Sequence, residues 1–81
     1  MEVRVRFFSQ LRDLAATGET NLKIEEGSTV EDLLQRLYAN GPALKTADKT
    51  ILVAAGVEFV GRDYVIRAGD EISIMPPVQG G

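Results

Sequence analysis

The sequence predicts an α+β fold, a β-grasp in which a mixed sheet packs on one main helix. Three features predict it: an alternating strand at the start, one strongly amphipathic helix, and three short strands near the end. The 81 residues suffice for one domain with a modest core. We expect a β-grasp domain over residues 1–75 and an extended, flexible C-terminal tail over residues 76–81.

The N-terminal elements follow from alternation and from helix boundary signals. Apolar and charged side chains alternate along residues 2–8, as they do in a strand with one buried face. Ser9 is expected to cap a short extra helix through its side-chain oxygen, and Gly18 is expected to end that helix. Residues 20–24 predict a second strand.

The main helix is predicted over residues 29–39. Its apolar side chains recur at helical spacing and form one stripe: Val30, Leu33, Leu34, Leu37 and Tyr38. Ser28 with Glu31 is one capping pair that suits its start, and Thr29 with Asp32 is the alternative. The Asn-Gly-Pro triplet that follows ends the helix, because proline cannot continue it.

Three short strands are predicted after an irregular stretch at residues 43–50. Residues 51–55 are continuously apolar, which suits a strand covered on both faces, and Gly56 is expected to mark a turn or a bulge. Residues 57–60 form the next strand, and residues 71–74 alternate again and close the sheet. The first and last strands are expected at the centre of the sheet.

The composition excludes most routes by which a small domain performs chemistry itself. The sequence contains neither Cys nor His, which removes thiolate metal sites, cysteine nucleophiles and the commonest general base. A net charge of −3 argues against nucleic-acid binding. We expect a cytoplasmic protein without a membrane partner, because the start lacks a signal peptide and no apolar run is long enough to span a bilayer.

The end of the sequence is its most informative segment: Met75-Pro76-Pro77-Val78-Gln79-Gly80-Gly81. The two prolines end the sheet and favour a stiff, extended conformation. The residues after Met75 reach about 20 Å when extended. Two glycines leave the terminal carboxylate without side chains around it. Such a tail can enter a narrow tunnel and present Gly81 to the active site of another protein.

A partner that receives this tail needs an apolar surface on which to dock. The candidates for that surface are Phe8, Phe59, Val60, Met75, Pro76, Pro77 and Val78. The alternative for Phe8 and Phe59 is an ordinary place in the core.

The charged residues are expected to have structural roles. The arginines are each expected on a solvated face: Arg4, Arg6, Arg12 and Arg62. Glu31 and Asp32 fall in the first turn of the main helix, where acidic side chains favour the helix dipole.

The ending resembles the Phe-Pro-Pro-Val-x-Gly-Gly end of the small subunits of molybdopterin synthase, a family of sulfur carriers with a ubiquitin-like β-grasp. Residues 5–14, 29–33 and 68–72 are similar to the family's first strand and short helix, its central helix start and its last turn. Two positions depart from the family pattern. Ala55-Gly56 stands where many members carry Asn, and Met75 replaces an aromatic residue.

The resemblance implies a protein cosubstrate without catalytic side chains of its own. In that family an E1-like adenylating enzyme uses ATP to convert the terminal glycine carboxylate into an acyl-adenylate, and sulfur then replaces the adenylate. The large subunit of molybdopterin synthase receives the thiocarboxylate and moves its sulfur to precursor Z during molybdenum cofactor biosynthesis. Carried over to this sequence, Gly81 is the reactive residue and Gly80 its neighbour. No bound cofactor and no metal are implied.

Three other functions stay open. A sulfur carrier for thiazole or tungsten pterin synthesis would use the same terminal chemistry. A ubiquitin-like modifier would attach an adenylated Gly81 to a lysine of another protein. A β-grasp interaction module would bind through its surface alone, and deletion of Gly81 distinguishes it from a carrier.

Overall fold

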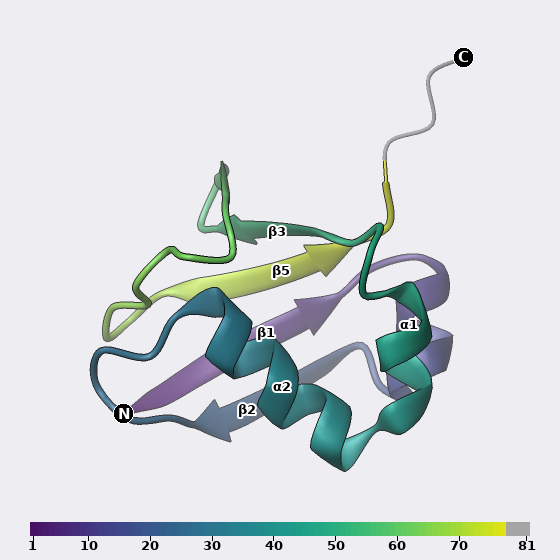
Figure 1. The fold of residues 1–81 in the computed structure, drawn as a ribbon, viewed down its shortest axis with the longest axis horizontal. Coiled ribbons are helices and arrows are strands. Elements are labelled where there is room, and N and C mark those ends of the chain that lie inside the picture. The colour runs from purple at the N-terminus through teal and green to yellow at the C-terminus, as the bar shows by residue number, and fades with distance from the viewer. Residues whose placement is uncertain (78–81) are drawn as a thin grey trace.

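The computed structural model describes residues 1–77, in which a five-stranded mixed sheet is covered on one face by helices (Figure 1). The elements are β1 (Glu2–Phe7), α1 (Gln10–Ala15), β2 (Glu19–Lys23), α2 (Val30–Asn40), the 3-10 helix η1 (Pro42–Ala47), β3 (Leu52–Ala55), β4 (Glu58–Val60) and β5 (Glu71–Met75). The strand order is β2-β1-β5-β3-β4. This arrangement confirms the predicted β-grasp, including its short extra helix after the first strand.

The first and last strands lie side by side inside the sheet, as predicted. β5 is the middle strand, and β1 is its parallel neighbour, with Val5 opposite Ile72. β2 and β3 pair antiparallel on either side of these two strands, and β4 forms one edge. Along β1, exposed and buried side chains alternate without a break. The period-two pattern of the sequence therefore sets which face of β1 meets the core.

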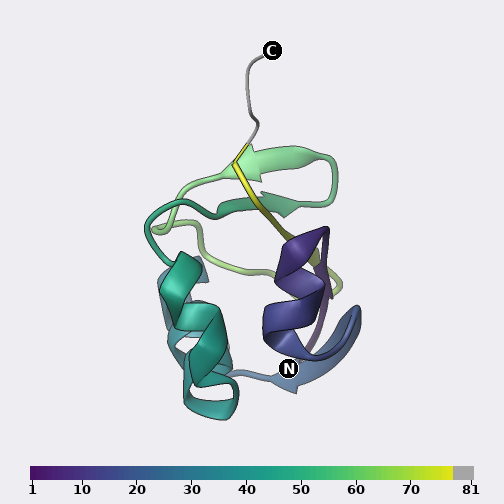
Figure 2. The ribbon, with the colours of Figure 1, turned by 90° about the vertical axis from the view of Figure 1, so that its right-hand side faces the viewer.

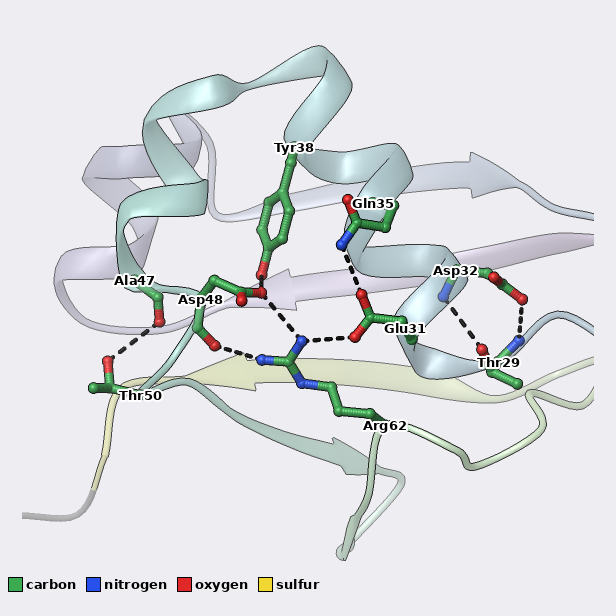
Figure 3. Close-up of polar contacts among 9 residues, drawn as sticks. All are labelled: Thr29, Glu31, Asp32, Gln35, Tyr38, Ala47, Asp48, Thr50 and Arg62. Carbon is green, nitrogen blue, oxygen red and sulfur yellow. Dashed lines mark hydrogen bonds and ion pairs between the residues drawn. The ribbon is translucent and has the colours of Figure 1, made fainter.

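Helix α2 begins at a capping box made by Thr29 and Asp32. The Thr29 hydroxyl accepts a hydrogen bond from the Asp32 N–H at 3.3 Å, and the Asp32 carboxylate accepts one from the Thr29 N–H at 3.0 Å (Figure 3). This is the second of the two capping pairs that the sequence allows. It leaves the Glu31 side chain free for another partner.

The connection from β1 into α1 differs from the prediction. Ser9 makes no capping hydrogen bond through its side chain, and its backbone has φ 53°. The chain reverses there in a tight turn, in which the Leu11 N–H donates to the Phe8 carbonyl at 3.1 Å. Helix α1 ends on Ala16 in the left-handed conformation, with φ 63°, rather than on Gly18. The turn geometry, which periodicity does not encode, decides both ends of this short helix.

The core lies between the sheet and the helices. Its largest fully buried side chains are Leu11, Leu33, Leu34, Leu44, Ile66, Ile72, Ile74, Val3, Val5 and Val30. Burying an aliphatic side chain of this size contributes about 1.5–3 kcal/mol, so these contacts hold the sheet on α2. Within residues 1–77, every buried side chain is hydrophobic. No helix in this part of the chain has the length and apolar character needed to cross a membrane.

Candidate functional site

The candidate site is the end of the sheet from which the C-terminal segment departs. β1 and β5 run parallel, so both strands end at the same side of the molecule, where α1 also begins (Figures 1 and 2). Phe7 lies opposite Ile74, and the next N–H, that of Phe8, donates to the Ile74 carbonyl at 3.1 Å. Met75 ends β5 and is the root of the tail. The middle strand of the sheet therefore fixes where the tail begins.

Apolar side chains surround this root on the outer face of the sheet, the face turned away from the core. Leu52 lies opposite Met75 in the β3–β5 register, and both are half-buried. Phe59 is 64% exposed and lies opposite Ala54, two residues along β3 from Leu52. That diagonal spacing is within reach of an aromatic side chain. Phe8, 36% exposed, directly follows β1 and flanks the root on that side.

We call Phe8, Leu52, Phe59 and Met75 the root patch. Three of these residues were predicted from the sequence to bind a partner. The sequence did not single out Leu52, because its apolar run suggested a strand covered on both faces. The signal that identifies Leu52 is its register with Met75, which places both side chains on the outer face.

The other predicted site residues lie in different surroundings. Val60 pairs with Val53 and packs partly buried against the core, so it faces away from the outer surface. Pro76 is half-buried and Pro77 exposed directly after β5. The predictions for Val78, Gly80 and Gly81 fall outside the described residues.

A tight turn between β3 and β4 holds Phe59 on the outer face. The two strands are joined by Gly56 and Val57, with Ala55 opposite Glu58. Gly56 has φ +62°, a left-handed conformation that glycine adopts without strain and that asparagine also tolerates. Gly56 therefore supplies the left-handed residue that this two-residue turn requires.

The rest of the outer face is charged. One row of residues crosses the sheet from its apolar to its charged half: Phe59, Ala54, Ser73, Arg6 and Glu19. Arg4 and Arg6 form ion pairs of 3.5–3.9 Å with Glu19 and Glu71, and these side chains are about half exposed. Pairs this exposed add little stability. The Arg6 guanidinium also lies 5.6 Å from the centre of the Phe8 ring, so it borders the root patch.

Arg62 does not lie on a freely solvated face, which corrects the sequence prediction. Its guanidinium donates to Glu31 Oε1 at 2.9 Å, to Asp48 Oδ1 at 3.1 Å and to the Asp48 carbonyl (Figure 3). The Tyr38 hydroxyl donates to the same Asp48 oxygen at 2.6 Å. Burial and this hydrogen bond raise the pKa of Tyr38, and the hydrogen bond lowers the pKa of Asp48. Three segments far apart in the sequence are joined here.

Comparison with known protein families identifies the family to which this fold and site belong. The sequence profile of the ThiS family matches residues 5–81. The chain belongs to the ThiS family. It is therefore a sulfur carrier of the ThiS and molybdopterin synthase small-subunit type, with the β-grasp that these carriers share.

Individual relatives of this carrier match over their full length. It is 34% identical to the molybdopterin synthase sulfur carrier subunit of Chlamydomonas reinhardtii, over 100% of both chains. It is 36% identical to the subunit of the same name in Escherichia coli, covering 98% of this chain and 99% of that one.

Solved structures show the same fold. SAMP1 from Haloferax volcanii matches with a TM-score of 0.87 and 27% identity over 100% of both chains. A chain of the complex of subunits 1 and 2 of molybdopterin-converting factor from Helicobacter pylori matches with a TM-score of 0.72 and 24% identity, over 100% of both chains. At that identity the likeness establishes the fold alone.

Proposed function

We propose that this carrier is the sulfur carrier subunit of a molybdopterin synthase. The observation that carries the proposal is the segment Met75-Pro76-Pro77-Val78-Gln79-Gly80-Gly81, which continues directly from the middle strand of the sheet. The full-length relatives of that name support the proposal. The root patch gives a receiving enzyme an apolar surface beside the segment that it must admit.

In this proposal the carrier contributes only the terminal carboxylate of Gly81, whose carbon is activated and then bonded to sulfur. The partner enzymes contribute the catalytic groups. An E1-like adenylating enzyme joins the Gly81 carboxylate to the α-phosphorus of ATP, which releases pyrophosphate and leaves an acyl-adenylate. A sulfur nucleophile attacks the carbonyl carbon, the bond to the AMP oxygen breaks, and a thiocarboxylate remains on Gly81. ATP is a substrate of the activating enzyme, so the carrier needs no nucleotide site of its own.

The carrier, now with a thiocarboxylate on Gly81, then docks on the large subunit of the synthase. The root patch packs on that subunit, and Pro76 and Pro77 direct the tail toward its active site. The thiocarboxylate sulfur attacks an electrophilic carbon of precursor Z there, and an oxygen substituent leaves that carbon. Water then hydrolyses the thioester between carrier and pterin, which leaves the sulfur on the pterin and restores the Gly81 carboxylate. The pterin gains one of the two sulfurs of its dithiolene, a second thiocarboxylated carrier supplies the other, and each carrier returns for another cycle.

Intact mass spectrometry tests the proposal. The purified chain is incubated with a matching E1-like enzyme, ATP and a sulfur donor, and its mass should rise by the difference between one sulfur and one oxygen. A variant lacking Gly81 should keep its mass. Addition of the large subunit and precursor Z should then yield molybdopterin. An unchanged mass, with the activating enzyme shown to charge its own carrier, would contradict the proposal.

A second candidate function is attachment to other proteins, favoured by the match to SAMP1, the small archaeal modifier protein 1. In that case the same acyl-adenylate leads to an amide bond between Gly81 and a lysine side chain. Arg67 is the last trypsin site before Gly81, so tryptic peptides that carry residues 68–81 on a lysine, dependent on the carrier, would support this function. Their absence under conditions that yield thiocarboxylate would leave sulfur delivery as the function.

A further inference from the structure

We infer that Arg62 is a positioning residue for docking, because it holds the β3–β4 hairpin and thereby the Phe59 side of the root patch. The inference rests on the proposed function and goes beyond it. Arg62 lies two residues after the end of β4, and its partner Asp48 lies four residues before the start of β3. The bond between them closes the base of the hairpin.

The contacts of Arg62 anchor that base to helix α2. The guanidinium spans from Glu31 on α2 to both the carboxylate and the carbonyl of Asp48 (Figure 3). Gln35 donates to the other oxygen of Glu31 at 2.6 Å, and the Tyr38 hydroxyl holds Asp48. Both carboxylates that accept from the guanidinium are therefore also held by another side chain of α2. Such a planar arrangement of donors is one that lysine cannot reproduce.

The hairpin needs this anchor because its own strand pairing is small. β4 has three residues, lies at the edge of the sheet and pairs with β3. Its aromatic residue, Phe59, is 64% exposed, so core packing does little to orient it. A hollow of about 330 Å³ is lined by both Leu52 and Phe59 of the root patch and also by Arg62. The anchor thus borders the surface whose geometry it maintains.

An ordered surface binds more tightly than a loose one, because less conformational freedom is lost on docking. We therefore expect Arg62→Lys, which keeps the charge, to weaken binding to the large subunit by about fivefold to tenfold. Asp48→Asn removes a negative charge but disturbs the same contact with Arg62, so it should weaken binding as well. Agreement between the two variants excludes a simple charge effect on the partner.

Two measurements test the inference on the full chain. The first is the affinity of Arg62→Lys and Asp48→Asn for the large subunit, compared with Ile24→Val, a core change after β2 at the opposite edge of the sheet. The second is amide hydrogen exchange of the free carrier. Loss of positioning should accelerate exchange in residues 53–60 selectively, while β1 and β5 keep their protection.

The outcomes separate positioning from stability. Wild-type affinity in Arg62→Lys would overturn the inference. So would a loss of affinity in Ile24→Val equal to that in Arg62→Lys at the same loss of stability, since any destabilised variant would then dock poorly. Failure of the wild-type carrier to bind the large subunit would count against the proposed function. If Arg62→Lys accelerated amide exchange equally in all strands of the sheet, that result alone would overturn the inference.

Discussion

The N–H of Phe8 donates to the carbonyl of Ile74 at 3.1 Å, which joins the end of the first strand to the residue just before the tail root. The two residues are far apart in the sequence, yet the parallel register of β1 and β5 brings them together. An aromatic side chain is thereby held next to Met75. The Phe8 side of the root patch and the origin of the tail are therefore joined directly by the pairing of β1 with β5.

The first prediction concerns this root patch. The double variant Phe8→Ala with Met75→Ala should lower affinity for the large subunit about thirtyfold or more, because apolar anchors at the centre of an interface each contribute about 1–2 kcal/mol or more. Titration calorimetry measures the change, and circular dichroism checks that the fold is retained. Val65→Ala, which truncates a 51% exposed side chain outside the patch, is the control and should bind normally. Unchanged affinity in the double variant would place the docking surface elsewhere.

The second prediction concerns the strained turn at Ser9. Its φ of 53° and ψ of −138° suit glycine, so Ser9→Gly should raise the free energy of unfolding by about 1 kcal/mol through relief of strain. Ser9→Ala should change stability by less than about 0.5 kcal/mol, because no side-chain cap is lost. Urea unfolding of both variants measures these values. A cost of about 1 kcal/mol or more in Ser9→Ala would instead indicate a capping hydrogen bond.

The third prediction concerns the pH dependence of stability. Folding lowers the pKa of Asp48 below its ordinary value of 3.8, so its contribution is present above about pH 4 and is lost as the pH falls through the folded pKa. Folding raises the pKa of Tyr38 above its ordinary value of 10.0. The Tyr38 contribution is therefore present below about pH 10 and is lost as the pH rises through the folded value.

Urea unfolding at a series of pH values tests both directions. Asp48→Asn should flatten the acid limb of the stability curve relative to wild type, and Tyr38→Phe should flatten the alkaline limb. Each variant should also be less stable near neutral pH. Tyr38→Phe loses the hydrogen bond from the Tyr38 hydroxyl to Asp48, and Asp48→Asn loses the charge that strengthens the bond from Arg62. An acid limb in Asp48→Asn as steep as that of the wild type would contradict the assignment to Asp48.

Much of the fold could be predicted because its signals are local. The alternation of β1, the apolar stripe of α2 and the prolines after β5 each depend on neighbouring residues. The boundaries were less predictable: β2 covers residues 19–23 rather than 20–24, and α1 ends on Ala16. Such limits depend on the turn conformation and on the strand opposite, neither of which a periodic pattern contains.

The sequence by itself determined the order of elements, the buried faces of β1 and α2, and the segment from Met75 to Gly81, because side-chain period and proline chemistry act over a few residues. Only the tertiary structure decided that Leu52 joins the root patch and that Val60 turns to the core. It also decided that Arg62 contacts Glu31 and Asp48, which are 31 and 14 residues away. These relations depend on strand register and on the meeting of distant segments around one core.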